Sequence, residues 1–325
     1  MKRFKHILCM VASGEQDRLA LERAISLAEN NHAELTVASV TQQVTGDIEI
    51  NDGDPVSVDL QQAIVKARQQ ELESLVQPYR ERLPIQTSVL VGISFLEIIR
   101  EVLRHGYDLV IKIPDTADWM DQLFGSDDMH LLRKCPCPVW LIRSEAAKPY
   151  RRILAAVDVN DQGRPEEHKA RTALNRQILE MAISLAISEF AELHIVNAWD
   201  AIGESAMRGV FLHTPEDKII AYVEQIRQHQ ATRFDSLIQE VTNSMGEDAV
   251  NYLKPQTHLV KGQARKEIPA LAKQISCDLV VMGTVARTGI PGFIMGNTAE
   301  TILNQIDCSV LAIKPPGFQT PVTIE

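Results

Sequence analysis

Three features that mark particular classes of protein are missing from this sequence. No apolar stretch comes near the roughly 18 residues that a membrane-spanning helix needs. The apolar stretch that follows the basic residues 1–6 ends at Ala12, which is shorter than the apolar core of a signal peptide. The five cysteines are scattered and form neither a disulfide framework nor a zinc motif. We therefore expect a cytoplasmic protein with reduced thiols and no membrane partner.

Basic residues are too few and too dispersed for a nucleic-acid-binding surface. The 325 residues include 33 Lys and Arg against 43 Asp and Glu, a formal net charge of -10. Because Lys and Arg do not gather into a stripe or a tail, the usual electrostatic footprint of nucleic-acid binding is missing. With 45% hydrophobic and 23% charged residues, the composition is that of a globular chain, and the length suits two domains. We expect no direct nucleic-acid partner.

What the sequence does contain is an internal repeat. Residues 22–28 (ERAISLA) reappear as residues 180–186 (EMAISLA), a shift of 158 positions. Residues 108–111 (DLVI) reappear as residues 278–281 (DLVV), at a shift of 170. The segments of each copy stay in the same order, and the shift grows only across connections. The chain is therefore a tandem duplication of one structural unit.

The repeated unit alternates short apolar runs with longer segments of helical period. The runs at residues 7–11, 109–113 and 139–142 are apolar enough for strands that are covered on both faces. The helical segments of the first copy include residues 16–30, 60–80 and 94–105. Such alternation predicts parallel strands joined by right-handed helical crossovers. We predict two tandem, doubly wound α/β domains, each with a five-stranded parallel sheet.

A polar segment around Pro149 separates the two copies. We place the first domain at residues 1–145, the second at residues 151–315 and a tail at residues 316–325. The last apolar run of each domain is an exposed edge unless something covers it. We therefore predict that the two domains pack together within one chain through residues 139–142 and 310–313. A homodimer of whole chains remains an open alternative.

The second copy is longer than the first. The shift between matching segments grows from 146 at the first run to 158 and then to 170, so two insertions of about a dozen residues are present. One insertion extends residues 159–175, and the other lies around residues 199–215.

A glycine-rich segment lies between an apolar run and a helical stretch of the second copy. Residues 283–297 (GTVARTGIPGFIMGN) resemble the signature of the universal stress protein family, which is Gly, two residues, Gly, nine residues, Gly and then Ser or Thr. Gly283 and Gly296 match the first and third glycines. Ala286 replaces the middle glycine, and Asn297 replaces the hydroxyl residue. The resemblance covers nearly the whole chain and is to the tandem, two-domain type, with the adenine-nucleotide-hydrolase-like fold.

The resemblance implies a ligand site beyond the carboxyl ends of the first and fourth strands. In such a site, a glycine-rich loop brings backbone amides close to phosphates, and the start of a helix favours an anion. Asp158 matches the aspartate that holds the adenosine part in nucleotide-binding members, and Met282 follows the fourth strand beside it. The remaining candidate ligand-binding residues are Thr284, Arg287, Thr298, Gly262 and Arg265.

Departures from the signature predict weaker anion binding in the second copy. If the middle glycine is needed for positive φ, Ala286 costs about 1 kcal/mol in strain or redirects the loop. Asn297 still suits a helix cap, although the phosphate ligand has changed. Asp158 has a structural alternative as a turn aspartate, because Asn160 and Asp161 follow it. For Gly262 and Arg265 the alternative interpretation is that they belong to an ordinary strand-to-helix turn.

The first copy departs further from the signature. Ala12 stands where the second copy has Asp158, Ile113 replaces the first glycine, and only Gly125 and Ser126 persist near the helix start. An anion would be repelled by five nearby carboxylates, which belong to Asp115, Asp118, Asp121, Asp127 and Asp128. We interpret these acids as a solvated face; a divalent cation site is the alternative, but the spacing of a calcium loop is lacking. We therefore expect the first domain to have mainly a structural role.

The Cys135-Pro-Cys137 motif, with His130 nearby, raises the question of metal or redox chemistry. Cys137 begins an apolar run and matches Cys308, which has no cysteine next to it in sequence. We therefore interpret these thiols as core side chains. No catalytic set of Ser, His and Asp and no pair of carboxylates recurs in the two copies, so we expect no metal site and no enzyme.

We expect a binding protein whose second domain holds a small molecule. The resemblance implies a role in the stress response and in resistance to damage, including DNA damage, by an indirect route. The loop is apolar at Ile290, Pro291, Phe293, Ile294 and Met295. Its ligand is therefore a nucleotide or an amphipathic anion, unless these side chains pack on the domain's own core. A weak ATP hydrolase and a ligand-free interaction scaffold are the alternatives.

Overall fold

The computed structural model describes residues 4–12, 17–44, 55–114, 127–143, 149–160, 164–209, 214–246, 252–284 and 295–324. Within these residues each copy contributes five strands. The strands of the first copy are β1 (His6–Met10), β2 (Glu34–Thr41), β3 (Ile85–Val91), β4 (Leu109–Lys112) and β5 (Val139–Leu141). Those of the second are β6 (Arg152–Val157), β7 (Glu192–Trp199), β8 (Gln256–Lys261), β9 (Leu279–Gly283) and β10 (Ser309–Ile313).

Helices connect the strands in both copies. The first copy has α1 (Asp17–Asn31), α2 (Pro55–Val76), a short 3-10 turn η1 (Gln77–Tyr79), α3 (Ser94–His105) and α4 (Asp127–Lys134). The second has α5 (Pro165–Glu189), α6 (Glu204–Arg208), α7 (Glu216–Met245), α9 (Ala264–Gln274) and α10 (Asn297–Leu303). This alternation of strands and helices confirms the predicted fold class.

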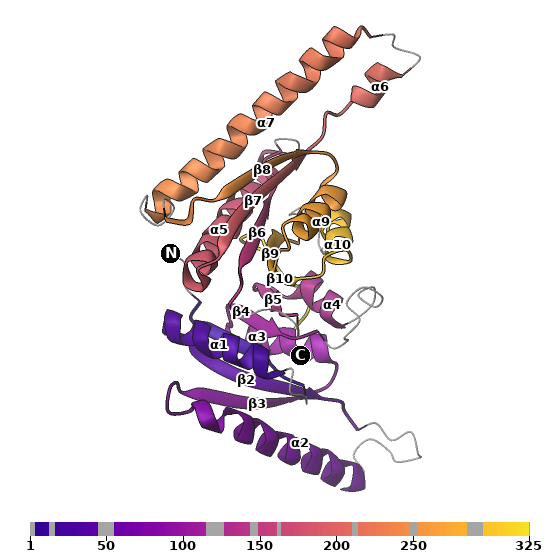
Figure 1. Cartoon of the computed structure of the whole chain (residues 1–325). Coiled ribbons are helices and arrows are strands. Elements are labelled where there is room, and N and C mark those ends of the chain that lie inside the picture. Colours follow the sequence, from indigo (N-terminus) through magenta and orange to yellow (C-terminus); the bar gives the residue numbers. More distant parts are fainter. Residues whose placement is uncertain are drawn as a thin grey trace.

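All ten strands belong to one continuous sheet in the order β3-β2-β1-β4-β5-β10-β9-β6-β7-β8. Within each half the strands are parallel, and the halves meet where β5 and β10 pair antiparallel. Val310 lies opposite Leu141, and Leu311 lies opposite Trp140. The two apolar edges therefore cover each other, and the predicted packing of the domains within one chain is confirmed. Figure 1 shows the sheet running from α2 beside β3 to α7 beyond β8.

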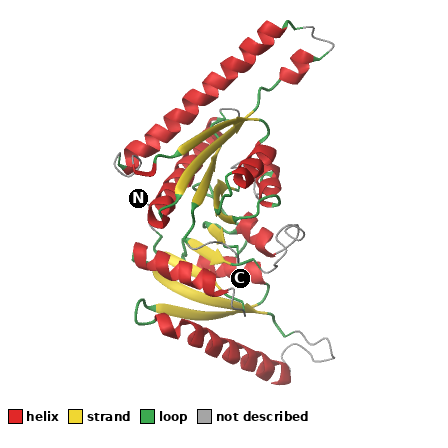
Figure 2. Cartoon of the chain, viewed as in Figure 1, coloured by secondary structure: helices red, strands yellow, loops and turns green. Residues whose placement is uncertain are grey.

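The central strands of the sheet are buried on both faces, and each face has its own core. Ile7 and Cys9 point to the side of α1, α2, α5 and α7, whereas Leu8 and Met10 point to the side of α3, α4, α9 and α10. These four side chains are at most 4% exposed. Because successive strand residues point to opposite faces, strands covered on both sides must be apolar throughout. Figure 2 shows the strands enclosed between the two layers of helices.

Both cores continue across the boundary between the domains, and polar contacts reinforce it. Arg23 of α1 forms an ion pair with Glu189 of α5, with 2.8 Å between Nη1 and Oε1. The same guanidinium lies 3.4 Å from the ring centre of Tyr150. On the opposite face, Arg133 of α4 pairs with Glu300 of α10 at 2.7 Å. The two domains are therefore joined through the sheet and through both helix layers.

The two insertions of the second copy have distinct structures. The first lengthens α5, which has 25 residues against 15 in α1. The second lies in the connection that contains α6 and leads into the long helix α7. The predicted tail returns to the first domain, where the Thr323 carbonyl accepts a hydrogen bond from Arg100 Nε at 3.3 Å. The boundary that we placed after residue 145 falls in a segment outside the described residues.

Candidate functional site

A cavity of about 310 Å³ opens in the second domain, beyond the carboxyl ends of β6 and β9. These two strands are parallel neighbours, with Ala156 opposite Met282. The helices that follow them, α5 and α10, pack on opposite faces of the sheet. When the segments that follow two adjacent strands turn to opposite faces of the sheet, a crevice forms between them. This crevice is the usual ligand site of open α/β sheets.

Six of the predicted site residues line this cavity. They come from the end of β6, from the end of β9 and the residue after it, and from the start of α10: Asp158, Met282, Gly283, Thr284, Gly296 and Thr298. Asp158 precedes the other five residues by more than 120 positions in sequence. The structure thus brings together the main part of the predicted site.

Other predicted site residues lie elsewhere. Ala286 and Arg287 fall outside the described residues. Arg265 is exposed on α9, where its Nε donates to Gln263 Oε1 at 3.0 Å, and its neighbours Ala264 and Ile268 line the cavity instead. Gly262 has φ of +144°, and a Cβ there would lie 2.5 Å from Glu267 Oε1. These contacts fit the turn that was the alternative for Gly262 and Arg265.

The start of α10 also differs from the expectation for Asn297. The N-cap residue is Gly296, and no side chain makes a capping hydrogen bond. Asn297 is instead the first residue of the helix, it is exposed, and it is not among the residues that line the cavity. The idea that Asn297 caps this helix is therefore wrong.

A whole wall of the cavity was not predicted from the sequence. Six residues of α5 contribute to it: Glu167, Ala170, Arg171, Leu174, Asn175 and Ile178. Residue 17, which begins α1 in the first domain, corresponds to residue 175, so residues 165–174 lengthen α5 at its amino end. The insertion within residues 159–175 was the only sequence signal for this wall.

Asp158 lies at the mouth of the cavity with its side chain 62% exposed. Its Oδ1 accepts a hydrogen bond from the Asn160 backbone at 3.0 Å, which is an Asx turn. Its Oδ2 lies 3.6 Å from Arg171 Nε. The Asn175 amide donates to the Asp158 carbonyl at 2.7 Å and accepts from the Asp158 backbone N–H at 3.1 Å. Asp158 therefore has a turn-forming role as well as a place in the cavity wall.

A buried lysine lies behind the wall on the β9 side. Lys314 follows β10 and is 5% exposed, and its ammonium donates to the Thr284 hydroxyl and to the Leu132 carbonyl. Burial lowers the pKa of Lys314 to about 8. Thr284 itself is 1% exposed and lines the cavity. The second domain thus keeps a cation next to the cavity, and this cation also contacts the first domain.

Gly283, the first glycine of the signature, packs closely against a side chain of α5. A Cβ at this position would lie only 2.6 Å from Leu174 Cδ2. Real Cβ atoms essentially never approach another atom within 3.0 Å, so a side chain here would require the Leu174 methyl group to shift. The glycine therefore lets α5 approach the end of β9 closely, and this approach forms the floor of the cavity.

The corresponding place in the first domain is nearly filled. A hollow of only about 90 Å³ remains there, and Lys112, Ile113 and Ala12 are among its lining residues. Lys112 Nζ lies 3.0 Å from Asp128 Oδ1 and donates to the Ile113 carbonyl at 3.2 Å. Lys112 is 5% exposed and Asp128 is 3% exposed. Asp128 is thus buried in an ion pair, which corrects its assignment to a solvated acidic face; Asp115, Asp118 and Asp121 lie outside the described residues.

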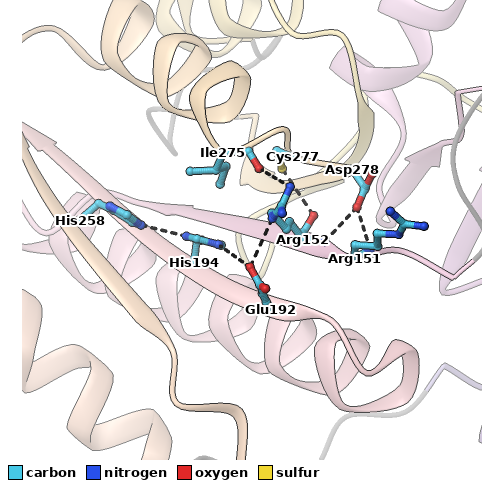
Figure 3. A network of polar contacts seen from close by, with 8 residues as sticks. All are labelled: Arg151, Arg152, Glu192, His194, His258, Ile275, Cys277 and Asp278. Atoms are coloured by element: carbon cyan, nitrogen blue, oxygen red, sulfur yellow. Dashed lines mark hydrogen bonds and ion pairs between the residues drawn. The ribbon is translucent and has the colours of Figure 1, made fainter.

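A second polar network of this domain lies away from the cavity, at the amino ends of β6 and β9 (Figure 3). His194 Nδ1 and His258 Nε2 are 3.0 Å apart, and Glu192 lies 3.8 Å from the other nitrogen of His194. Asp278 accepts hydrogen bonds from the backbone N–H groups of Arg151 and Arg152. Burial lowers the pKa of both histidines, so both are held neutral near pH 7.

The described residues offer neither a metal-binding cluster nor a membrane-spanning helix. In the part of the chain that the structure describes, no group of three or more His, Cys, Asp or Glu side chains is suited to a metal ion. None of the described helices is both long and apolar enough to span a bilayer.

The sequence is similar to known proteins over its full length. The model of the universal stress protein family matches residues 3–143 and again residues 149–314. "Universal stress protein E" of Escherichia coli (strain K12) is 27% identical over 329 residues, which cover 100% of this chain and 98% of that protein. A "Universal stress protein E homolog" of Haemophilus influenzae is 29% identical and covers 96% and 98%.

Solved structures share the same two-domain arrangement. A protein of unknown function from Pseudomonas aeruginosa PAO1 superposes with a TM-score of 0.62 at 28% identity, covering 96% of this chain and 93% of that one. A universal stress protein from Archaeoglobus fulgidus has the same TM-score at 17% identity, covering 95% and 98%. At that identity the second similarity shows the fold alone.

Proposed function

The chain belongs to the universal stress protein family, and we propose that it acts as a cytoplasmic binding protein whose second domain holds one small ligand. The cavity beyond β6 and β9 is the observation that carries this proposal. Its volume of about 310 Å³ lies in the range of small-molecule sites, which are mostly apolar with a few polar groups. At the equivalent position of the first domain, the residues that the structure describes leave a hollow of only about 90 Å³, so we assign that domain an architectural role.

The lining of the cavity favours an amphipathic ligand over a nucleotide triphosphate. Its deeper wall is apolar, formed by Leu174, Ile178, Ile268, Met282 and Ile302. At the mouth, Asp158 and Glu167 accompany Arg171, and a polyanion would be repelled by the two carboxylates. A ligand with an apolar body and a single anionic group suits both parts, because that group can approach Arg171 or the Thr284 hydroxyl.

Binding, and not catalysis, is the role that these residues support. Among the residues that the structure describes, the titratable side chains that line the cavity are Asp158, Glu167 and Arg171, and Asp158 is already engaged by Asn160 and Arg171. Weak ATP hydrolysis remains the enzymatic rival, and a ligand-free scaffold is the rival among interaction proteins. A small ligand also suits an indirect role in resistance to stress, including DNA damage, since a net charge of -10 opposes direct contact with DNA.

Native mass spectrometry of the purified chain tests the proposal. We expect a retained molecule at one per chain, with a mass below that of ATP and an anionic group. Incubation with ATP under the same conditions should produce at most weak additional occupancy. A chain that retains nothing and binds neither amphiphiles nor nucleotides would leave the scaffold as the correct interpretation, and measurable phosphate release from ATP would favour the hydrolase.

Substitution of Asp158 tests where the ligand lies. Asp158→Asn keeps the Asx turn and should lower ligand occupancy, because the carboxylate no longer orients Arg171 at the mouth. Stability should change by no more than about 0.5 kcal/mol, since the side chain is largely exposed. Asp158→Ala also removes the turn and should cost about 1 kcal/mol.

Asp235→Asn, an exposed change on α7, serves as the matched control and should alter neither quantity. If Asp158→Ala loses stability while its full ligand complement remains, then Asp158 has only the structural role and the ligand lies elsewhere.

A further inference from the structure

Two cysteine thiols face each other at the boundary between the domains, outside the ligand cavity. Cys135 and Cys137 lie on either side of Pro136 in the link between α4 and β5. Their sulfur atoms are 3.6 Å apart, and both cysteines are free. The side chains are 0% and 7% exposed, as expected for core residues. At this separation one thiol donates a hydrogen bond to the other. Packing of two core side chains does not by itself require so close an approach of the sulfurs.

The buried ammonium of Lys314 belongs to the same cluster. It donates to the carbonyl of Leu132, near the end of α4 just before the cysteines. Its positive charge also interacts electrostatically with the two cysteines. With a pKa of about 8, Lys314 is largely protonated at neutral pH. A lysine of the second domain thus supplies positive charge to a dithiol of the first.

The two thiols have different acidities. Burial raises the pKa of Cys135, but hydrogen bonds from the Cys137 thiol and backbone N–H, together with the charge of Lys314, outweigh burial and lower that pKa below its ordinary value. The hydrogen bond to Cys135 and burial both raise the pKa of Cys137. The direction of these shifts assigns Cys135 as the attacking thiolate, and the 3.6 Å between the two sulfur atoms places Cys137 to resolve its oxidised form.

We propose that Cys135 and Cys137 form a dithiol that hydrogen peroxide oxidises to an intrachain disulfide. The Cys135 thiolate attacks one peroxide oxygen and the O–O bond breaks, so that Cys135 becomes a sulfenic acid and the hydroxide that leaves is protonated to water. The Cys137 sulfur then attacks the Cys135 sulfur, and the S–S bond forms as a second hydroxide leaves and is protonated. The two thiols thus give up two protons and two electrons, and the peroxide becomes two water molecules.

The second domain provides a built-in comparison. Cys308 corresponds to Cys137, and Cys277 lies beside it. Cys277 is more exposed than either cysteine of the first pair, and both Cys277 and Cys308 line a cavity of about 320 Å³. Burial raises the pKa of Cys277, and no cation contributes to its pKa within the described residues. If access alone decided reactivity, Cys277 would react first; if thiolate formation decides it, Cys135 reacts first.

Mass spectrometry after peroxide treatment of the full chain tests this order. Trypsin cuts after Lys134 and Arg143, so one peptide, residues 135–143, carries both cysteines of the pair. After brief treatment with limiting peroxide and blocking of free thiols with N-ethylmaleimide, this peptide should be lighter by two hydrogens and carry no maleimide. Cys9, Cys277 and Cys308 should still be blocked as free thiols. Dithiothreitol should restore both maleimide adducts on the 135–143 peptide.

Substitutions of Lys314 separate the role of its charge from its role in packing. Lys314→Met should slow formation of the disulfide roughly three- to tenfold, because the fraction of Cys135 thiolate falls. Lys314→Arg keeps the charge and should retain most of the rate. Lys273→Met, an exposed change beside Cys277 and Cys308, is the matched control and should leave the rate unchanged.

Cys137→Ser traps the intermediate. Without its partner, Cys135 should accumulate as a sulfenic acid that dimedone captures. The proposal would be overturned if, in the parent chain, Cys277 were oxidised before the two cysteines of the 135–143 peptide. This outcome needs no variant. The proposal would also be overturned if Lys314→Met kept the circular dichroism spectrum and the oxidation rate of the parent.

Discussion

The first and second domains share one topology but fill the same position in opposite ways. At the carboxyl end of β9, the second domain has Met282 and Gly283 beside a cavity of about 310 Å³. At the carboxyl end of β4, the first domain has Lys112 and Ile113 beside a hollow of about 90 Å³. The Lys112 ammonium pairs with Asp128 of α4, the helix that corresponds to α10. An internal ion pair thus occupies the region that the second domain leaves open.

The helices around this position also differ between the two domains. In the second domain the amino end of α5 extends over the crevice and supplies Glu167, Ala170 and Arg171 to its wall. In the first domain α1 begins at a residue that corresponds to residue 175, so those turns have no counterpart among its described residues. After duplication, one fold can thus keep a site in one copy and a filled core in the other, through changes at strand ends and helix starts alone.

The largest expected effect comes from breaking the ion pair of the first domain. Lys112→Met introduces the residue of the second domain and leaves Asp128 buried without its cation. Because Lys112 and Asp128 are 5% and 3% exposed, the variant should lose about 3 to 5 kcal/mol of unfolding free energy. Urea unfolding followed by circular dichroism measures the loss.

The double variant Lys112→Met with Asp128→Thr is the control for this experiment. It removes both charges together, so it should recover most of the stability and approach that of the parent. Equal destabilisation of the single and double variants would show that the pair contributes only through packing and does not act as a charge pair.

The next effect comes from giving the second domain the residue of the first at the end of β9. Gly283→Ile places side-chain atoms where Leu174 already packs, since even a Cβ would be 2.6 Å from Cδ2. We expect a loss of about 1 to 3 kcal/mol and a loss of bound ligand. Leu174→Ala in the same chain should restore part of the stability. An unchanged unfolding midpoint for Gly283→Ile would mean that α5 shifts freely, and that it does not fix the floor of the cavity.

The fold could be predicted from sequence because its determinants are local and repeated. Runs such as residues 109–113 are apolar on both faces, so their burial between helices follows directly. Pairing of β5 with β10 followed from two apolar edges that needed cover, and the structure shows this pairing. The start of α2 was placed too late, at residue 60 instead of Pro55, because apolar periodicity is weak in its first turns.

The site could be predicted only in part, because it depends on contacts between distant segments. Asp158 and Met282 were found through the resemblance, since each directly follows or ends a strand run. Arg171 and Asn175 have no distinctive pattern in a helix, and only the insertion indicated that something was added there. Asp128 looked like one of several solvated acids, because nothing in sequence shows that Lys112, 16 residues earlier, reaches it.

A smaller effect concerns a titratable pair that only the second domain has. His194 and His258 correspond to Thr36 and Ser88 of the first domain, where Tyr107 donates to Thr36 at 2.9 Å. Burial lowers the pKa of both histidines, so below about pH 6.5 the unfolded chain binds more protons than the folded one. Stability should therefore fall as pH decreases from 7 to 5.

The swap His194→Thr with His258→Ser should remove most of that fall in urea unfolding at the two pH values. His229, an exposed residue of α7, offers the control His229→Ser, which should leave the pH dependence as in the parent. If the double variant keeps the full dependence on pH, then carboxylates elsewhere in the chain are its source.

The smallest expected effect is a gain, from repairing the signature of the second domain. Ala286→Gly with Asn297→Ser restores both missing residues, and ATP affinity should rise about threefold, a change of about 0.7 kcal/mol, because loop amides and a hydroxyl become available to phosphate. Isothermal titration of the double variant against the parent measures the gain.

Ile113→Gly, the matching repair of the first domain, should give no ATP binding, since the Lys112–Asp128 pair still fills that position. An absent heat signal for the repaired second domain would show that the loop is not what excludes ATP, and that Asp158 and Glu167 at the mouth of the cavity repel the triphosphate instead.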